Sequence, residues 1–214
     1  MSSSDVPKAF HVMAKPTGSA CNLKCDYCFF LKKEKLYPGS DFRMSDEVHE
    51  AYIRQLLEAH QVPHVTIAWQ GGEPTLMGLD FFRRAAELLK AYARPGVRVE
   101  QTLQTNGVLL DEEWCEFLRE EGFLVGLSLD GPREVHNAFR RDYQGEGTFE
   151  RVMRAARRLQ EYGVAFNVLA TVHAANGDYP GECYRFFRDE LKAEYLQFIP
   201  IVERINDQGE TGRQ

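Results

Sequence analysis

The chain has 214 residues, a formal net charge of −6 and 43% hydrophobic residues, which is typical of a globular protein with one large domain or two small ones. This mild acidity, without a basic stripe, argues against nucleic acid as a partner. No run approaches the roughly 18 apolar residues of a membrane span, and the N-terminal sequence MSSSDVPKAFHVMAK lacks a secretory signal pattern. We therefore expect a cytoplasmic protein with no membrane partner and with reduced thiols.

Apolar, β-branched runs alternate with amphipathic helical patterns along the chain. The sequence predicts six strands, over residues 9–15, 64–69, 97–105, 124–130, 164–172 and 193–202. It predicts five helices between them, over residues 45–60, 79–93, 111–121, 148–162 and 181–192. N-terminal caps are expected at Ser45, Asp80 and Asp111, and glycine stops at Gly122 and Gly163. The densest basic run, RAARR at 154–158, is expected to be a solvated helix face.

Strands separated by helices of this length form βαβ units, and therefore an α/β fold with a parallel sheet. The strands are apolar along most of their length, which is typical of strands covered on both faces. We expect one domain over residues 1–202. Residues 203–214 are polar and aperiodic and are expected to be a tail, so the pattern offers no helix to cover the last strand.

The unusual residues of the chain all follow predicted strands. These stretches are CNLKCDYC (21–28), QGGEPT (70–75), TNG (105–107) and SLDGP (128–132). Because ligands in parallel α/β folds bind at the carboxyl ends of the strands, we expect these loops to form one site. The loop after the first strand is far longer than the usual length of about 2–6 residues, as functional loops often are.

Cys21, Cys25 and Cys28 are spaced C-x3-C-x2-C. A structural zinc site needs four ligands, so that interpretation requires a fourth ligand from elsewhere in the chain. On a 4Fe–4S cluster, three thiolates leave one iron open. A small molecule could bind this iron through an amine and a carboxylate. Both interpretations are consistent with the spacing alone.

Five further residues complete the expectations about sulfur and its surroundings. Tyr27, Phe29 and Phe30 lie within or next to the cysteine motif and are expected to form an aromatic shell that keeps water from a redox cluster. Cys115 and Cys183 each stand alone inside a helical pattern. We expect both to be buried as small hydrophobic side chains.

The QGGEP loop suits a zwitterionic ligand. Gly72 lets the backbone approach a ligand closely. Glu73 is a carboxylate at a strand end, suited to pairing with an ammonium group. The bare string is also compatible with a plain glycine turn ahead of a helix, and TNG is a turn by composition that can also hydrogen-bond a ligand.

The segment around SLDGP offers two more candidate groups. The hydroxyl of Ser128 can hydrogen-bond ribose, and the guanidinium of Arg140 can hold a carboxylate with two bonds. Asp130 begins a turn sequence in its own right. Arg140 could equally form a surface pair with the adjacent Arg141, and His136 is interpreted as a loop histidine.

These pieces together resemble the radical S-adenosylmethionine (SAM) superfamily, through the cysteine spacing with an aromatic residue before the third cysteine, the GGE motif after the second strand and the βα order. More specifically, KPTGSACNLKCDYCFF, WQGGEPTL, LQTNG, VGLSLDGP and YLQFIP are similar to the anaerobic sulfatase-maturating enzymes. The resemblance extends from about Val12 to about Val202. It implies a partial (β/α)6 TIM-like barrel with parallel strands.

The resemblance also implies roles for individual residues. Three thiolates would hold a 4Fe–4S cluster whose open iron binds SAM: Cys21, Cys25 and Cys28. The remaining contacts to SAM would be Tyr27 at the adenine, Gly72 at the amino group, Ser128 at the ribose, Arg140 at the carboxylate, and Val202, with Ile201 as the alternative, lining the adenine pocket.

The implied reaction begins when an electron donor such as flavodoxin or ferredoxin reduces the cluster. SAM is then cleaved to methionine and a 5′-deoxyadenosyl radical, which removes hydrogen from Cβ of a cysteine or serine in a target sulfatase. Loss of a second electron and hydrolysis give Cα-formylglycine. Two alternatives remain: a radical SAM enzyme that makes crosslinks in a ribosomal peptide, and a zinc-stabilised binding module.

Members of that family continue into a cysteine-rich domain that holds two further clusters and the catalytic base. This chain has no cysteine after Cys183. Residues 203–214 are therefore interpreted as the start of a missing C-terminal auxiliary-cluster domain, in which the base is expected.

Overall fold

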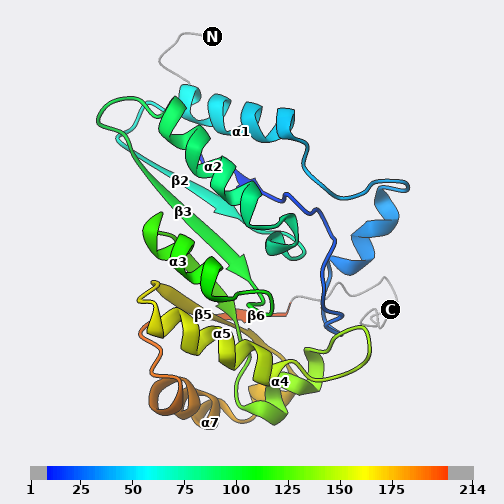
Figure 1. Cartoon of the computed structure of the whole chain (residues 1–214). Helices are drawn as coiled ribbons and strands as arrows, with labels where there is room; N and C mark the ends of the chain where they lie inside the picture. The colour runs from blue at the N-terminus through cyan, green and yellow to red at the C-terminus, as the bar shows by residue number, and fades with distance from the viewer. Residues whose placement is uncertain (1–8, 202–214) are drawn as a thin grey trace.

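The computed structural model describes residues 9–201 and contains a six-stranded sheet in which all neighbouring strands are parallel. The strands lie side by side in sequence order (Figure 1), namely β1 (Met13–Ala14), β2 (His64–Trp69), β3 (Arg98–Thr105), β4 (Leu124–Ser128), β5 (Phe166–Val172) and β6 (Leu196–Pro200). Within the described residues β1 and β6 are the two edges and do not pair with each other. This open parallel sheet confirms the predicted partial barrel.

Helices connect the strands. The α-helices are α1 (Asp46–Ala59), α2 (Leu79–Tyr92), α3 (Glu112–Glu120), α4 (Arg133–Phe139), α5 (Phe149–Glu161), α6 (Ala174–Gly177) and α7 (Pro180–Arg185). Two 3₁₀ turns, η1 (Leu31–Leu36) and η2 (Pro74–Met77), and a π-helical turn, η3 (Phe186–Glu190), complete the described elements. None of the helices in residues 9–201 is both long enough and apolar enough to cross a membrane.

Side-chain caps mark the first residues of α1 and α3. The Ser45 hydroxyl accepts a hydrogen bond from the backbone N–H three residues on, and Asp111 does the same for α3. Both caps confirm the sequence prediction. The prediction for α2 is wrong, because Gly78 occupies the cap position and Asp80 lies in the first turn. At the ends of α3 and α5, the glycine stops adopt the left-handed backbone that glycine favours; Gly122, for example, has φ 65°.

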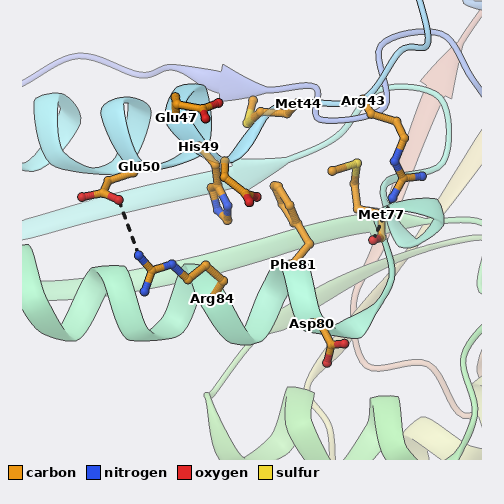
Figure 2. Close-up of a pocket in the computed structure, with 10 residues that line it drawn as sticks. Arg43, Met44, Glu47, His49, Glu50, Met77, Asp80, Phe81 and Arg84 are labelled. Carbon is orange, nitrogen blue, oxygen red and sulfur yellow. Dashed lines mark hydrogen bonds and ion pairs between the residues drawn. The ribbon is translucent and has the colours of Figure 1, made fainter.

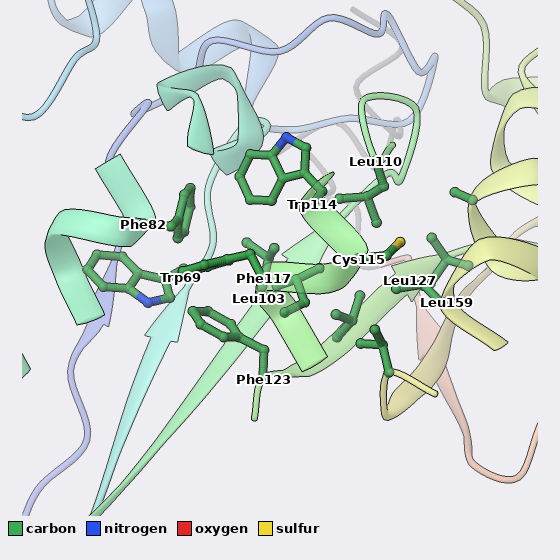
Figure 3. Packing of buried hydrophobic residues seen from close by; sticks show 14 of the residues in the cluster. Trp69, Phe82, Leu103, Leu110, Trp114, Cys115, Phe117, Phe123, Leu127 and Leu159 are labelled. Atoms are coloured by element: carbon green, nitrogen blue, oxygen red, sulfur yellow. The ribbon is translucent and has the colours of Figure 1, made fainter. Parts of the chain in front are cut away.

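The hydrophobic core lies between the sheet and the helices that cover it (Figure 3). Aromatic rings pack edge to face through its centre, with ring centroids 5.8 Å apart for Trp69 and Phe82 and 5.3 Å apart for Phe82 and Trp114. Cys115 and Cys183 are buried in the same cluster, which confirms their expected role as small hydrophobic side chains.

Three predictions about the elements need correction. The first strand is only two residues long, and the helix expected over 181–192 divides into α7 and η3. Helix α4 was not predicted, because its seven residues are too few to show a clear periodicity. The sequence offered no helix to cover the last strand, and in the described residues β6 is an edge strand in which Phe198 is 50% and Ile199 is 37% exposed.

Candidate active site

The loops that follow β1, β2 and β3 are joined by hydrogen bonds at the carboxyl end of the sheet. The Glu73 N–H donates to the Ala20 carbonyl oxygen at 2.8 Å. The Asn106 side-chain amide donates to Oδ1 of Asn22 at 2.7 Å and lies 3.8 Å from Sγ of Cys21. The predicted convergence of these loops is therefore present in the fold, and it places the cysteine motif next to the QGGEP and TNG loops.

The three thiols of the motif are available as ligands. Cys21 and Cys28 are half-buried, Cys25 is buried, and none of them forms a disulfide. Within residues 9–201 no three His, Cys, Asp or Glu side chains are placed to bind a single metal ion. In a 4Fe–4S cluster each thiolate binds its own iron, so three thiolates would leave one iron open.

Backbone and charge also act on these sulfur atoms. The Leu23 N–H donates to Sγ of Cys21 at 3.4 Å, the kind of contact that tunes a cluster thiolate. Burial raises the pKa of Cys21 to about 12 and that of Cys25 to about 11, although Leu23 and Arg140 respectively lower them. Without metal both thiols are protonated at neutral pH, and a bound cluster must displace these protons.

Gly72 lies against the cysteine loop. A Cβ atom at this position would be 1.9 Å from the Ala20 carbonyl oxygen, a distance that no side chain can occupy. Its N–H donates to the Gly18 carbonyl oxygen at 2.9 Å. Only glycine lets the QGGEP loop pack this closely on the segment that precedes Cys21.

The expectation that Glu73 pairs with an ammonium group is wrong. Its carboxylate is buried and accepts hydrogen bonds from the chain itself: from N–H and Oγ1 of Thr75 at 3.1 and 2.6 Å, from Oγ1 of Thr105 at 2.7 Å and from the Asn106 N–H at 2.7 Å. Burial raises the pKa of Glu73, and these donors oppose that rise. Glu73 therefore fastens the loop after β2 to the end of β3.

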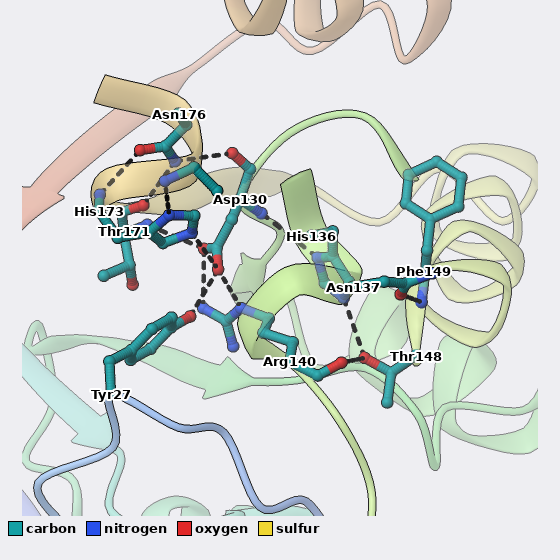
Figure 4. A network of polar contacts seen from close by, with 11 residues as sticks. Tyr27, Asp130, His136, Asn137, Arg140, Thr148, Phe149, Thr171, His173 and Asn176 are labelled. Carbon is teal, nitrogen blue, oxygen red and sulfur yellow. Dashed lines mark hydrogen bonds and ion pairs between the residues drawn. The ribbon is translucent and has the colours of Figure 1, made fainter. Parts of the chain in front are cut away.

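Asp130 is the centre of a buried polar network (Figure 4). Its carboxylate accepts from the Tyr27 hydroxyl at 2.6 Å, from Nε and Nη2 of Arg140 at 2.8 and 3.1 Å, and from the Thr171 N–H at 2.9 Å. Nε2 of His173 lies 3.4 Å from the same carboxylate. Because Tyr27 lies between Cys25 and Cys28, the network ties the cysteine motif to the ends of β4 and β5.

The charges in this network are strongly coupled. Burial alone would raise the pKa of Asp130, but Arg140 and the hydrogen-bond donors hold it well below its usual range. Burial likewise opposes the charge of Arg140, and Asp130 raises the pKa of this guanidinium above its usual value. Arg140 is 8% exposed, so its interpretation as a surface pair with Arg141 is wrong.

His136 makes further hydrogen-bond contacts with the network through Asp130 and Thr148. It lies in helix α4 and is fully buried, so its interpretation as a loop histidine is wrong. The Asp130 N–H donates to Nδ1 at 3.4 Å, and Nε2 lies 2.9 Å from Oγ1 of Thr148, which donates to the Arg140 carbonyl oxygen. Burial lowers the pKa of His136 to about 3, so the ring is neutral.

The loop after β5 adds two residues that the sequence did not reveal. His173 stacks on Tyr27 with ring centroids 5.6 Å apart. The Asn176 side-chain amide donates to the carbonyl oxygens of Asp130 and Thr171 at 3.1 and 2.8 Å. The sequence around them, TVHAANG, carries no motif; their only signal is their position just after a predicted strand.

Three further predictions concern the residues proposed to contact the ribose and the adenine and the aromatic shell around the cysteines. Ser128 is the last residue of β4, is 8% exposed, and its hydroxyl makes no hydrogen bond within the described part of the chain. Val202 lies outside the described residues, whereas the Ile201 N–H donates to the Val172 carbonyl oxygen at 3.3 Å. The predicted aromatic shell is wrong for Phe29, which is 63% exposed.

A pocket in the described residues lies elsewhere, between α1 and α2 (Figure 2). It has a volume of about 610 Å³ and is lined by charged side chains together with His49 and Phe81, whose rings stack 3.9 Å apart. Neither the cysteine motif nor the Asp130 network contributes to its walls. The pocket is therefore separate from the candidate active site.

Residues 16–187 match the Radical SAM superfamily, a span that includes the three cysteines, the QGGEP loop and the Asp130 network. The chain belongs to the radical SAM superfamily. Radical SAM enzymes use a 4Fe–4S cluster and SAM, and the three free thiols described above are the ligand type that such a cluster needs.

The chain also matches individual proteins of known function along most of its length. The chain is 44% identical over 199 residues to a serine-type anaerobic sulfatase-maturating enzyme of Bacteroides thetaiotaomicron, covering 92% of this chain and 48% of the relative. It is 40% identical to a cysteine-type enzyme of Clostridium perfringens, covering 92% of this chain and 53% of the relative. The chain thus spans about half the length of the curated relatives it matches.

A solved structure shows the same fold. Native anSMEcpe with bound AdoMet and Cp18Cys peptide is 40% identical and has a TM-score of 0.85, covering 94% of this chain and 53% of that chain. This match confirms the predicted radical SAM core.

Proposed function

We propose that this chain is the radical SAM core of an anaerobic sulfatase-maturating enzyme, which oxidises a cysteine or serine of a sulfatase polypeptide to Cα-formylglycine. The observation that carries the proposal is the 44% and 40% identity to a serine-type and a cysteine-type enzyme over 92% of the chain. A more general radical SAM relationship would be expected to preserve the fold with much lower identity.

Different residues of the chain would bind the cluster and SAM. Cys21, Cys25 and Cys28 would hold the 4Fe–4S cluster, which supplies one-electron reductive cleavage of SAM. Gly72 would bring backbone groups close to the amino group of SAM, and Ser128 would offer its free hydroxyl to the ribose.

Tyr27 and Arg140 would act from the Asp130 network. Asp130 occupies Nε and Nη2 of Arg140, while Nη1 has no hydrogen-bond partner within the described residues. This nitrogen remains for the carboxylate of SAM, in a guanidinium already held in place. Tyr27 would line the adenine side with its ring, since its hydroxyl is bound to Asp130. Val202 would complete the adenine pocket.

The overall change in the target would be a two-electron oxidation in which SAM is the oxidant. One hydrogen atom would pass from Cβ of the target residue to the 5′-deoxyadenosyl group, and the second electron would pass to an oxidised iron–sulfur cluster while a proton goes to a base. Serine would lose two hydrogen atoms to give the aldehyde. Cysteine would lose two hydrogen atoms to give a thioaldehyde, which water hydrolyses to the aldehyde and hydrogen sulfide. A flavodoxin or ferredoxin is the proposed source of the electron that starts each cycle.

The test is to incubate the anaerobically reconstituted chain with SAM, dithionite and sulfatase-derived peptides carrying either cysteine or serine. Mass spectrometry should detect a product that reacts with a hydrazide, because formylglycine carries an aldehyde. A peptide that loses two hydrogen atoms but does not react with hydrazide would support the alternative, peptide crosslinking.

The matched variants are Cys25→Ala, which removes a proposed cluster ligand, and Cys115→Ala, which removes a thiol from the core. Only Cys25→Ala should abolish product. Equal activity in Cys25→Ala and the unaltered chain would exclude the proposed role of the motif. Failure to modify either peptide, with SAM still cleaved, would mean that this chain cleaves SAM but oxidises a peptide only together with the expected C-terminal auxiliary-cluster domain.

A further inference from the structure

An exposed patch of aromatic, aliphatic and basic side chains follows the cysteine motif directly. Three large hydrophobic residues are mostly exposed: Phe29 at 63%, Leu36 at 68% and Tyr37 at 62%. Between them, on η1, are three exposed lysines, Lys32, Lys33 and Lys35. We call these six residues the lysine–aromatic patch.

The patch has a defined local structure. No residue of η1 is buried, and in Figure 1 this blue helical turn stands at the side of the molecule, away from the sheet. The Phe29 and Phe30 rings lie 4.4 Å apart, and Nζ of Lys33 lies 4.9 and 5.1 Å from their centroids. Cation–π contacts of this kind hold the aromatic rings in an exposed arrangement.

The patch is close to the proposed cluster along the chain. Phe29 is bonded directly to Cys28, which is itself half-buried. On the other side of the cysteine loop, the Lys24 N–H donates to the Arg141 carbonyl oxygen at 2.8 Å, and Tyr143 is 58% exposed. The exposed side of the cysteine motif is therefore bordered by solvent-accessible rings.

The charge of the patch differs from that of the whole protein. The η1 sequence LKKEKL has three lysines and one glutamate, whereas the chain carries a net charge of −6. Exposed apolar side chains interspersed with basic ones are typical of a surface that docks a partner, and the local positive charge selects an acidic one. Electron-transfer encounters bury little area, below about 1,200 Å² in total, so a compact patch is sufficient.

From these observations we infer that the lysine–aromatic patch docks an acidic one-electron donor protein, which delivers its electron to the cluster through the face at Cys28. In the step itself the reduced donor loses one electron and the oxidised cluster gains it, with no bond made or broken. This inference rests on the proposed function, because only a cluster held by the motif gives the electron a destination.

The first test measures binding, which does not require the cluster. The chain without iron is titrated with an acidic flavodoxin at low and moderate ionic strength. The variant is Lys32→Glu with Lys35→Glu, which leaves the Lys33 stacking contacts in place. The matched control is Arg154→Glu with Arg157→Glu on α5, which changes the net charge equally at exposed positions of the other basic run.

We expect the patch variant to weaken flavodoxin binding by about tenfold or more at low salt, and the control by less than about twofold. Binding by the unaltered chain should also weaken as salt is added. Equal losses in the two variants, or no loss in either, would overturn the inference. So would a patch variant that loses binding to anionic lipid vesicles while binding flavodoxin normally.

The second test uses the reconstituted holoprotein and separates this inference from the proposed function. Reduction of the cluster by flavodoxin should slow by about tenfold in the patch variant, while reduction by dithionite stays unchanged. If dithionite supports no SAM cleavage even in the unaltered chain, the proposed function fails, and the binding test still decides the role of the patch. Equal rates of flavodoxin reduction in the patch variant and the control would refute the docking site.

Discussion

The substitution Asp130→Asn should destabilise the fold strongly. Oδ2 of Asp130 accepts from the Tyr27 hydroxyl and from Nε of Arg140, so an amide nitrogen at this position would face two donors. The substitution also leaves the Arg140 guanidinium buried without its counter-charge. Breaking a buried ion pair in this way costs about 3–5 kcal/mol. Urea unfolding at pH 7, followed by circular dichroism, measures this loss.

Two comparisons make the test specific. The exposed pair of Arg188 and Asp189 has equally short contacts, 2.6 and 2.7 Å, so Asp189→Asn should cost less than about 0.5 kcal/mol. In the double variant Asp130→Asn/Arg140→Met the buried cation is also removed, and the losses should fall short of additive by about 1–3 kcal/mol. A loss below about 1 kcal/mol for Asp130→Asn, or full additivity, would refute the view of Asp130 as the centre of the network.

Three further substitutions test other parts of the account. Gly72→Ala forces a methyl group onto a backbone oxygen and should destabilise the chain by about 1–3 kcal/mol and lower its iron content on reconstitution, whereas Gly177→Ala, with open space around it, should do neither. Glu73→Gln turns an amide nitrogen toward donors such as the Asn106 N–H and should cost about 1–3 kcal/mol by urea unfolding; an unchanged midpoint would contradict its role as a fastener. Burial lowers the pKa of His49 from 6.5 to about 4, so the unfolded chain gains a proton below pH 6.5 that the folded chain gains only near pH 4. Stability should therefore fall by about 1.4 kcal/mol per pH unit over this window, and His49→Met should flatten the slope of urea midpoint against pH; identical slopes would show that this ring is not the cause.

Much of the fold could be predicted because local signals and tertiary packing agree. The apolar run HVTIAW became β2 with its predicted bounds, and Ser45 and Asp111 cap the helices they precede. The gathering of the unusual loops was predictable as well, since the carboxyl ends of parallel strands lie at one edge of the sheet. The length of the first strand was overestimated, because within the described part of the predicted run only Met13 and Ala14 pair with β2.

The internal contacts of the site could not be predicted in the same way. Asp130 reads as a turn residue in the sequence, and His173 has no motif around it; only the fold brings these side chains to Tyr27. The sequence assigned Glu73 to a ligand because a carboxylate at a strand end is a common ligand-binding group. The fold instead supplies four donors from neighbouring loops. Contacts between distant segments decide which polar groups hydrogen-bond within the protein and which remain for a ligand. The periodicity of the sequence does not reveal these contacts.

The most direct test of the central claim is anaerobic reconstitution of the chain with iron and sulfide, followed by EPR of the reduced protein with and without SAM. The account predicts a 4Fe–4S signal that changes when SAM is added, because the three cysteines leave one iron open, together with release of 5′-deoxyadenosine. A chain that retains no iron and binds zinc tightly through Cys21, Cys25 and Cys28 would contradict it.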